Sequence, residues 1–181
     1  MDDFARMHKE MEQYDATREL LIKQGRDVLK AAKKMIYALH RNETISIAKL
    51  LSAKKALDAI AKKHEGLRYE GSYSSALEEF VEAMCYHAFV HHKPLPPAIE
   101  LGVNAEVYLM GICDLTGELS RRAVRSATAK NLNEVKRIAS FLDDLEGELI
   151  RFDFRNGNLR KKYDAVKWNL KKVEEILYDT Q

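Results

Sequence analysis

Hydrophobic residues recur at helical spacing over most of this chain. Toward the N-terminus, one face of a predicted helix carries Leu21, Val28, Ala32, Met35 and Leu39. The C-terminal segment repeats the pattern at intervals of three and four, in Leu159, Tyr163, Val166, Leu170, Val173 and Leu177. No segment alternates apolar and polar residues with the period of two that a half-buried strand requires. The pattern therefore predicts an all-α fold.

Turn and capping residues divide this pattern into a bundle of about six to seven helices. Ser75 and Glu78 have the spacing of a capping box at a helix start. The expected helices run from near the N-terminus to His40 or Arg41, through Ile47 and Ile60 to a stop at Gly66, from Ser75 to about His91, from Asn104 to about Ala129, from Asn133 to Arg155 and from Asn158 to Tyr178, with a loop from Lys93 to Val103. The length of 181 residues fits a single helical domain, residues 1–181.

Composition excludes several classes of protein. A hydrophobic fraction of 46% is too high for a disordered chain, and no apolar run is long enough to cross a membrane. The polar N-terminus, MDDFARMHKEMEQ, is unlike a secretory signal. Cys85 and Cys113 both lie inside helix-like apolar runs, which favours reduced core thiols over a structural disulfide. We therefore expect a soluble cytoplasmic protein.

Two pairs of carboxylates have a spacing that can support chemistry. Glu79 and Glu82 are three residues apart in EEFVEAMCYH, and Asp114 and Glu118 are four apart in YLMGICDLTGEL. Each pair shares one helix face. Asp114 also interrupts a stretch that reads as buried nearly all round. A carboxylate in such surroundings is costly unless it is paired, protonated or bound to a metal.

The four carboxylates converge if their two helices pack side by side. Such a cluster would repel itself without a cation, and an all-oxygen donor set with no nearby His or Cys favours Mg²⁺ or Mn²⁺. A bound ion of this kind can activate water and neutralise charge on a phosphodiester. The alternative is that Glu79 and Glu82 form a solvated face and that Glu118 pairs with Arg122. Spacing alone favours this alternative, and only the apolar setting of Asp114 opposes it.

The first helix also carries a basic stripe. Its members, Lys23, Arg26, Lys30, Lys33, Lys34 and Arg41, recur at intervals of about three, four or seven residues. The net charge of the whole chain is only +2, so any nucleic-acid surface must come from local segregation of charge such as this. The stripe can follow a phosphate backbone without reading sequence. The competing interpretation is a solvated face kept soluble by lysine.

The last helix has a second basic cluster, which we interpret as mostly structural or interfacial. Its members are Arg160, Lys161, Lys162, Lys167, Lys171 and Lys172. Tyr163 and Trp168 on the same helix are expected to pack in a core or a subunit contact. His87, His91 and His92 near the end of the third predicted helix could assist proton transfer, but a histidine at a helix end is more often a surface or capping residue.

Several of these segments resemble the translin/TRAX family. The C-terminal segment of this chain, NLRKKYDAVKWNLKKVEEILYD, resembles the ending of translin-family proteins. The segment RDVLKAAKKMIYALHR resembles the first long helix of the same family. The signature stretches of the TRAX branch are matched by EFVEA and DLTGELSR. These segments cover most of the chain in the family's order. The loop between the two signatures is shorter than in TRAX, and the tail is more similar to translin.

The resemblance implies an all-helical protein that assembles into octameric barrels. Translin and TRAX together form an endoribonuclease that cuts RNA inside the barrel, with catalysis from TRAX, because translin lacks the acidic cluster. Carried onto this chain, Glu82 and Glu118 are the leading magnesium ligands, and Glu79 and Asp114 complete the site or orient the water. The expected protein is a magnesium-dependent endoribonuclease, with Mn²⁺ as a substitute, that binds RNA and forms a homo-oligomer, an octamer by family analogy.

Two other functions remain open at this point. One is a non-catalytic, translin-like protein that binds single-stranded nucleic acid, and loss of the acidic cluster would mark it. The other is a structural helical subunit that needs a catalytic partner. The intact set of four acids favours the nuclease over both.

Overall fold

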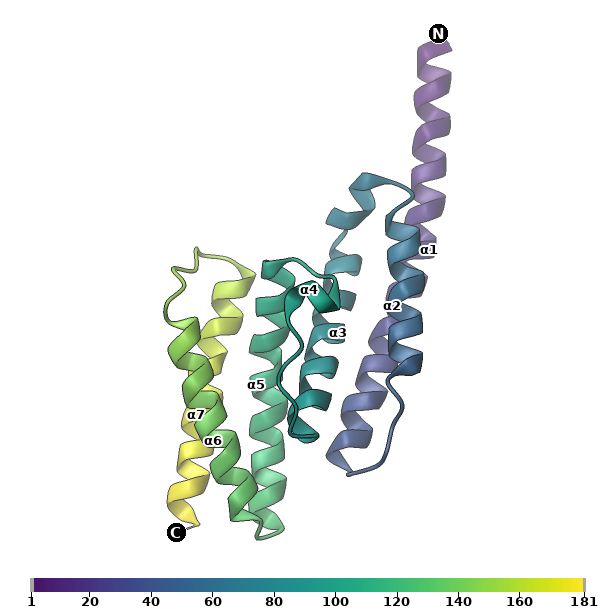
Figure 1. The fold of residues 1–181 in the computed structure, drawn as a ribbon. Helices are drawn as coiled ribbons and strands as arrows, with labels where there is room; N and C mark the ends of the chain where they lie inside the picture. Colours follow the sequence, from purple (N-terminus) through teal and green to yellow (C-terminus); the bar gives the residue numbers. More distant parts are fainter. Residues whose placement is uncertain (1, 181) are drawn as a thin grey trace. The chain divides into compact units, whose positions relative to one another are not determined.

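The computed structural model describes residues 2–180 and contains seven α-helices, one 3-10 helix and no strand in that range (Figure 1). This confirms the all-α prediction. The elements are α1 (Asp2–His40), α2 (Ala48–Ala61), η1 (Glu65–Tyr69), α3 (Gly71–Val90), α4 (Ala98–Leu101), α5 (Ala105–Thr128), α6 (Leu132–Leu149) and α7 (Asn158–Asp179). The chain divides into two compact units, one up to Met84 and the other from Cys85, so α3 belongs to both.

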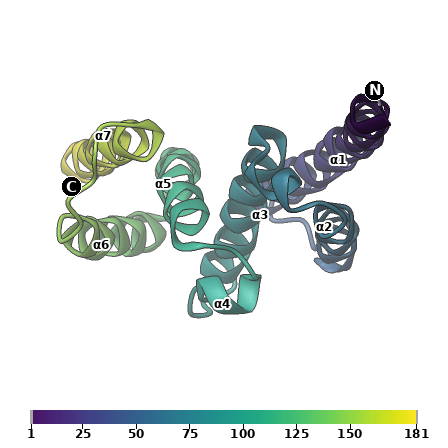
Figure 2. The ribbon, with the colours of Figure 1, turned by 90° about the horizontal axis from the view of Figure 1, so that it is seen from above.

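In the first unit, α1 lies beside α2 (Figure 2). All five residues predicted for the apolar face of α1, from Leu21 to Leu39, are buried as expected. Full burial of a side chain such as Leu or Met is worth about 1.5–3 kcal/mol. Gly25 permits a close approach of α3, because a Cβ at that position would lie 3.2 Å from the carbonyl oxygen of Ser72. The Tyr73 hydroxyl donates to Asp58 of α2 at 2.9 Å and ties the start of α3 to α2.

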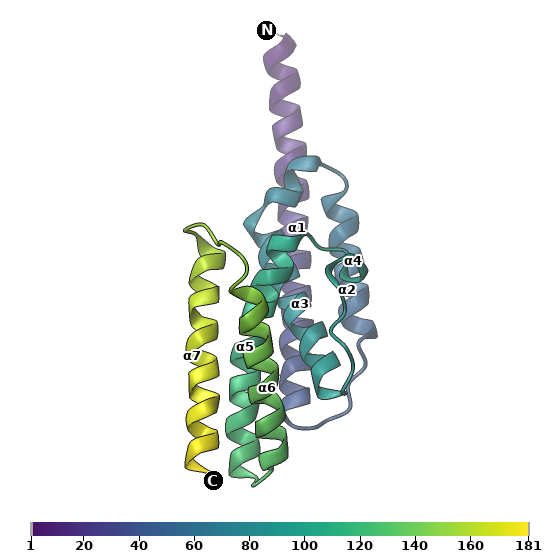
Figure 3. The ribbon, with the colours of Figure 1, turned by 60° about the vertical axis from the view of Figure 1, so that its left-hand side comes forward.

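In the second unit, α5 packs against both α6 and α7 (Figure 3). Tyr163, Val166, Leu170 and Val173 of α7 are buried, as their spacing predicts. Tyr163 and Val166 share a cluster with Cys113 of α5. The predicted bounds of α5 and α7 agree with the structure to within a residue.

Two predicted helix boundaries before and after η1 are wrong. α2 ends at Ala61 and not at Gly66, because His64 is extended and its Nδ1 accepts a hydrogen bond from the Gly66 N–H at 3.2 Å. Gly66 lacks the positive φ of a helix-ending glycine and lies within η1. α3 begins at Gly71, so Ser75 lies in its second turn and forms no capping box. The carbonyl of Glu70 instead accepts from the Tyr73 N–H at 2.9 Å.

The other two differences lie in the second unit. The predicted loop from Lys93 to Val103 contains α4, which Gly102 ends with a φ of 63°. α6 runs from Leu132 to Leu149 and not from Asn133 to Arg155. Asn131 caps it by accepting from the Glu134 N–H at 3.2 Å. Beyond its C-terminus, the rings of Phe152 and Phe154 stack 5.4 Å apart, and Phe154 packs against a buried cluster that includes Tyr163 and Val166.

Cys85 and Cys113 are both free and buried, as predicted. Burial raises the pKa of each thiol to about 12, which makes both unreactive near neutral pH. Within residues 2–180, none of the helices has the length and apolar character needed to span a bilayer.

Candidate functional site

The first carboxylate pair lies on α3, within the first unit. Glu79 forms an ion pair with Lys33 of α1, with 3.7 Å between Oε1 and Nζ. Glu82 is only 8% exposed. Because burying a carboxylate is costly, a glutamate is held in this position only by compensating interactions. The alternative that Glu79 and Glu82 form a solvated helix face is therefore wrong for Glu82.

The second pair lies on α5, within the second unit. Met110, Ile112, Cys113 and Leu115 around Asp114 are buried, as the sequence predicts, whereas the Asp114 side chain itself is 32% exposed. Its carboxylate accepts a short hydrogen bond from the ammonium of Lys162 on α7. The sequence could not show this contact, because it depends on how α7 packs against α5. Glu118 lies 3.7 Å from the guanidinium of Arg121.

Three of the four carboxylates, those of Glu79, Asp114 and Glu118, thus lie beside a cationic side chain. Ion pairs of this partly exposed kind contribute about 0–1 kcal/mol each, so a multivalent cation can compete with them for the oxygens. Carboxylate oxygens suit a hard ion such as Mg²⁺, and in that respect the donor set fits. No group of three or more His, Cys, Asp or Glu side chains in the described range has the arrangement of a metal site. Convergence of the four acids therefore stays a prediction.

All six members of the basic stripe, five on α1 and Arg41 directly after it, are exposed, but they differ in their partners. Lys33 pairs with Glu79, and Arg41 pairs with Glu43. Within residues 2–180, the remaining four, Lys23, Arg26, Lys30 and Lys34, have no ion-pair partner. These four cations are consequently the ones free to meet an external anion.

A groove between α1 and α2 brings a further lysine to part of this stripe. It has a volume of about 1040 Å³, and its lining includes Lys30 and Lys34 of α1 together with Lys49 of α2. Lys23, Arg26, Lys33 and Arg41 lie outside the lining. Sequence reasoning missed Lys49, because its proximity to the stripe depends on how the two helices pack.

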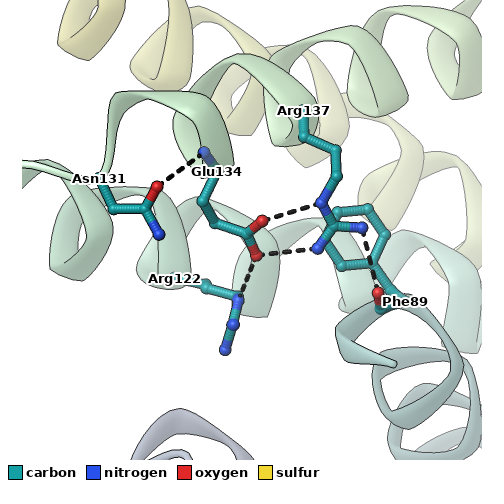
Figure 4. Close-up of polar contacts among 5 residues, drawn as sticks. All are labelled: Phe89, Arg122, Asn131, Glu134 and Arg137. Atoms are coloured by element: carbon teal, nitrogen blue, oxygen red, sulfur yellow. Dashed lines mark hydrogen bonds and ion pairs between the residues drawn. The ribbon is translucent and has the colours of Figure 1, made fainter. Parts of the chain in front are cut away.

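Sequence reasoning also missed an ionic network centred on Glu134 (Figure 4). The Glu134 carboxylate accepts from Arg122 at 2.7 Å and twice from Arg137 at 2.8 Å. Arg137 also donates to the carbonyl of Phe89 at 3.1 Å, and its guanidinium lies 3.8 Å from the centre of that ring. Burial alone raises the pKa of Glu134, but the hydrogen bonds from Arg137 and Arg122 outweigh it and lower the pKa to about 2. The network joins α3, α5 and α6 within the second unit.

Several basic residues of α7 have local roles, as predicted. Arg160 pairs with Asp164 at 3.2 Å and Lys171 with Glu175 at 3.8 Å. Tyr163 is buried, but Trp168 is 70% exposed. A core position is thus wrong for Trp168, and a subunit contact remains a prediction for it.

The histidines at the C-terminal end of α3 interact with one another. His91 Nδ1 lies 2.8 Å from the carbonyl oxygen of His87, and the two rings are 4.1 Å apart. Burial lowers the pKa of His87, and His91 and Lys93 lower it further. This local packing agrees with a helix-end role.

Comparison with known proteins identifies a single family over most of the chain. The sequence model of the Translin family matches residues 16–181. Translin of Gallus gallus is 39% identical over 77 residues, which are 42% of this chain and 34% of that protein. The chain therefore spans about a third of the length of this curated relative. The translin-associated protein X homolog of Schizosaccharomyces pombe is 22% identical over 183 aligned positions, 89% of this chain and 79% of that protein.

Solved structures show the same fold. The structure of apo-NeC3PO superposes with a TM-score of 0.83 at 22% identity and covers 100% of this chain and 98% of that one. The AfC3PO–duplex RNA complex superposes with a TM-score of 0.81 at 21% identity, covering 98% of this chain and 96% of that one.

Proposed function

Because this chain belongs to the translin family, we propose that it is a magnesium-dependent endoribonuclease that hydrolyses RNA phosphodiester bonds. The observation that carries the proposal is the presence of all four acids of the TRAX signatures, Glu79, Glu82, Asp114 and Glu118, with Glu82 held in the interior. A solvated, incidental set of acids would not include a buried glutamate.

In the proposed site, Glu82 and Glu118 hold the cation, while Glu79 and Asp114 complete the site or orient the attacking water. A bound Mg²⁺, or Mn²⁺ in its place, would supply Lewis-acid activation and would neutralise charge on the phosphodiester. The chain's own contribution is to fix the carboxylate oxygens and to direct the water toward phosphorus by accepting its hydrogen bonds. Lys33 and Lys162 offset the charge of Glu79 and Asp114.

The basic stripe is proposed to hold the RNA backbone, with Lys23, Arg26, Lys30, Lys33, Lys34 and Arg41 as its members. Lys33 and Arg41 already have acidic partners, so the four unpaired cations are expected to contribute most. By family analogy the assembly is a homo-oligomer, an eight-chain barrel. The two buried free thiols fit a reducing compartment, and we place the protein in the cytoplasm.

Replacing Lys23 and Arg26 together by alanine is expected to weaken RNA binding about tenfold near 0.1 M salt. The salt slope is the slope of the logarithm of the binding constant against the logarithm of the salt concentration. Because each neutralised phosphate of a single strand contributes about 0.7 to its magnitude, the magnitude should fall by about 1.4 when two cations are removed. Fluorescence anisotropy across a salt series measures both quantities. Lys9→Ala, an exposed change on the same helix outside the stripe, serves as the control and should change neither. Equal behaviour of the two variants would remove Lys23 and Arg26 from the binding surface.

The proposed activity is tested with the purified wild-type protein and internally labelled single-stranded RNA. Cuts at internal positions are expected with Mg²⁺ and none with EDTA, while RNA binding persists in both. Tight binding without any cutting in Mg²⁺ or Mn²⁺ would refute the nuclease.

A specific observation favours the second candidate, a non-catalytic translin-like protein that binds single-stranded nucleic acid. The local identity to translin, 39%, exceeds the 22% identity to the translin-associated protein X homolog. The same assay separates the two candidates, since both bind RNA and only the nuclease cuts it.

A further inference from the structure

The groove between α1 and α2 has an apolar floor. Ala31, Ala53 and Ala56 are small residues that leave the space open, and Met35 and Leu50 are buried core residues that also contribute to its lining. All of these residues belong to the first unit, and the segment joining α1 to α2 adds Ile45. Its volume of about 1040 Å³ lies at the upper end of the range for ligand sites.

Three ammonium groups line the same groove. Lys30 and Lys34 lie one turn apart on α1, and Lys49 lies in the first turn of α2. Within the described range none of the three has an ion-pair partner. Two acids also line the groove, but Glu43 is paired with Arg41, which leaves Asp27 as the opposing charge. The groove thus combines an excess of unpaired cations with an exposed apolar surface.

This combination matches a flexible polyanion that also carries flat apolar groups. In single-stranded RNA the bases are free to turn toward an apolar surface while the phosphates meet cations at its edge. An A-form duplex keeps its bases paired and stacked, so it presents phosphates and 2′-hydroxyls and leaves such a floor uncovered.

We infer that the α1–α2 groove binds a single-stranded segment of RNA, with phosphates at Lys30, Lys34 and Lys49 and bases on the apolar floor, and that it thereby selects single strands over duplex. The inference deepens the proposed function and rests on it, since the RNA held here is the substrate of the carboxylates. It assigns Lys49 and the alanine floor a role in binding. It also gives Lys30 and Lys34 a binding role in the groove that the other four residues of the stripe do not share.

The charge contribution is tested with Lys49→Ala in the full-length protein. Anisotropy with a labelled single-stranded oligoribonucleotide in EDTA measures binding without cutting. We expect the variant to bind about threefold to tenfold more weakly near 0.1 M salt and its salt slope to fall by about 0.7. The matched control is Lys55→Ala, an exposed lysine of the same helix that does not line the groove. This control should bind like the wild type.

The apolar floor is tested with Ala56→Leu, which fills the groove without changing its charge. Ala56 is exposed on α2 and leucine is a good helix former, so the fold should be unaffected. Because the leucine side chain would occupy the space that a base needs, single-strand affinity should fall about tenfold. Affinity for a duplex of the same sequence should not change, and neither should the salt slope.

Four outcomes would overturn the inference. If both variants bind single strands like the wild type, the groove is not an RNA site, and the proposed function still stands provided that the wild type binds and cuts. If Lys49→Ala weakens duplex and single strand equally while Ala56→Leu changes nothing, the groove is a phosphate surface without strand selectivity. If the variants change the size of the assembly by light scattering without changing RNA affinity, the groove is a protein contact. If the wild type binds no RNA, this inference and the proposed function fail together.

Discussion

Replacing Asp114 by alanine is expected to lower the rate of Mg²⁺-dependent RNA cleavage at least about a thousandfold. Loss of one group from the metal and water site removes several kcal/mol of transition-state stabilisation, and about 4 kcal/mol corresponds to this factor. Alanine is the informative change, because asparagine would still present an oxygen ligand. Single-turnover cleavage of labelled RNA measures the rate, and RNA binding in EDTA should match the wild type.

Lys162→Ala is the matched control for Asp114→Ala. It breaks the same ion pair from the other side and leaves the carboxylate in place. The two side chains are 28% and 32% exposed, so losing the pair should cost at most about 1 kcal/mol of stability. We expect Lys162→Ala to lose far less cleavage than Asp114→Ala, because the carboxylate oxygens remain. An equal loss of activity in both variants would mean that Asp114 acts by fixing α7 and not in the chemistry.

Replacing Glu134 by alanine is expected to lower the free energy of unfolding by about 3–5 kcal/mol. The change leaves Arg122 and Arg137 without their shared carboxylate in a site where Glu134 is only 10% exposed. Urea denaturation monitored by circular dichroism measures the effect. Glu148→Ala, which breaks the exposed Glu148–Arg151 pair, should change stability by less than about 0.5 kcal/mol. Similar effects for the two variants would contradict a structural role for the network.

The same network predicts how stability depends on acid. Since the pKa of Glu134 is lowered from 4.5 to about 2, its contribution is fully present above pH 4.5. That contribution is lost as the pH falls toward 2, and it amounts to about 3 kcal/mol. Unfolding free energies of the wild type should therefore fall more steeply over this range than those of Glu134→Ala. Parallel curves would show that the two arginines do not stabilise the ionised carboxylate.

The helices that the sequence predicts well are those whose burial is local to one face. α1 and α7 each bury a single continuous stripe, so periodicity alone identifies both. The end of α6 is different, because the helix continues through Gly147 and then stops at Leu149, well before the turn residues Asn156 and Gly157. There, the ring of Phe154 packs 5.2 Å from the ring of Tyr163 on α7, a contact with the next helix that periodicity within α6 does not predict.

The candidate site was predictable in its residue types and not in its partners. Spacing and resemblance identify Glu79, Glu82, Asp114 and Glu118, but burial of Glu82 and pairing of Asp114 with Lys162 depend on tertiary packing. Arg122 illustrates the same limit. Spacing offered Glu118, one turn earlier, as a possible partner and gave no sign of the contact with Glu134, twelve residues away, that the structure shows. Local sequence does not reveal contacts of that kind.

The most direct test of the central claim, that Glu79 and Asp114 both serve the same cleavage reaction, is a double-mutant cycle on RNA cleavage. The wild type, Glu79→Ala, Asp114→Ala and the double variant are compared under single-turnover conditions with Mg²⁺. Residues of one catalytic unit are strongly non-additive. We therefore predict that each single variant loses most of the activity and that the double variant is no worse than the poorer single one. Cleavage that survives either single change, or losses that multiply in the double variant, would contradict the shared site.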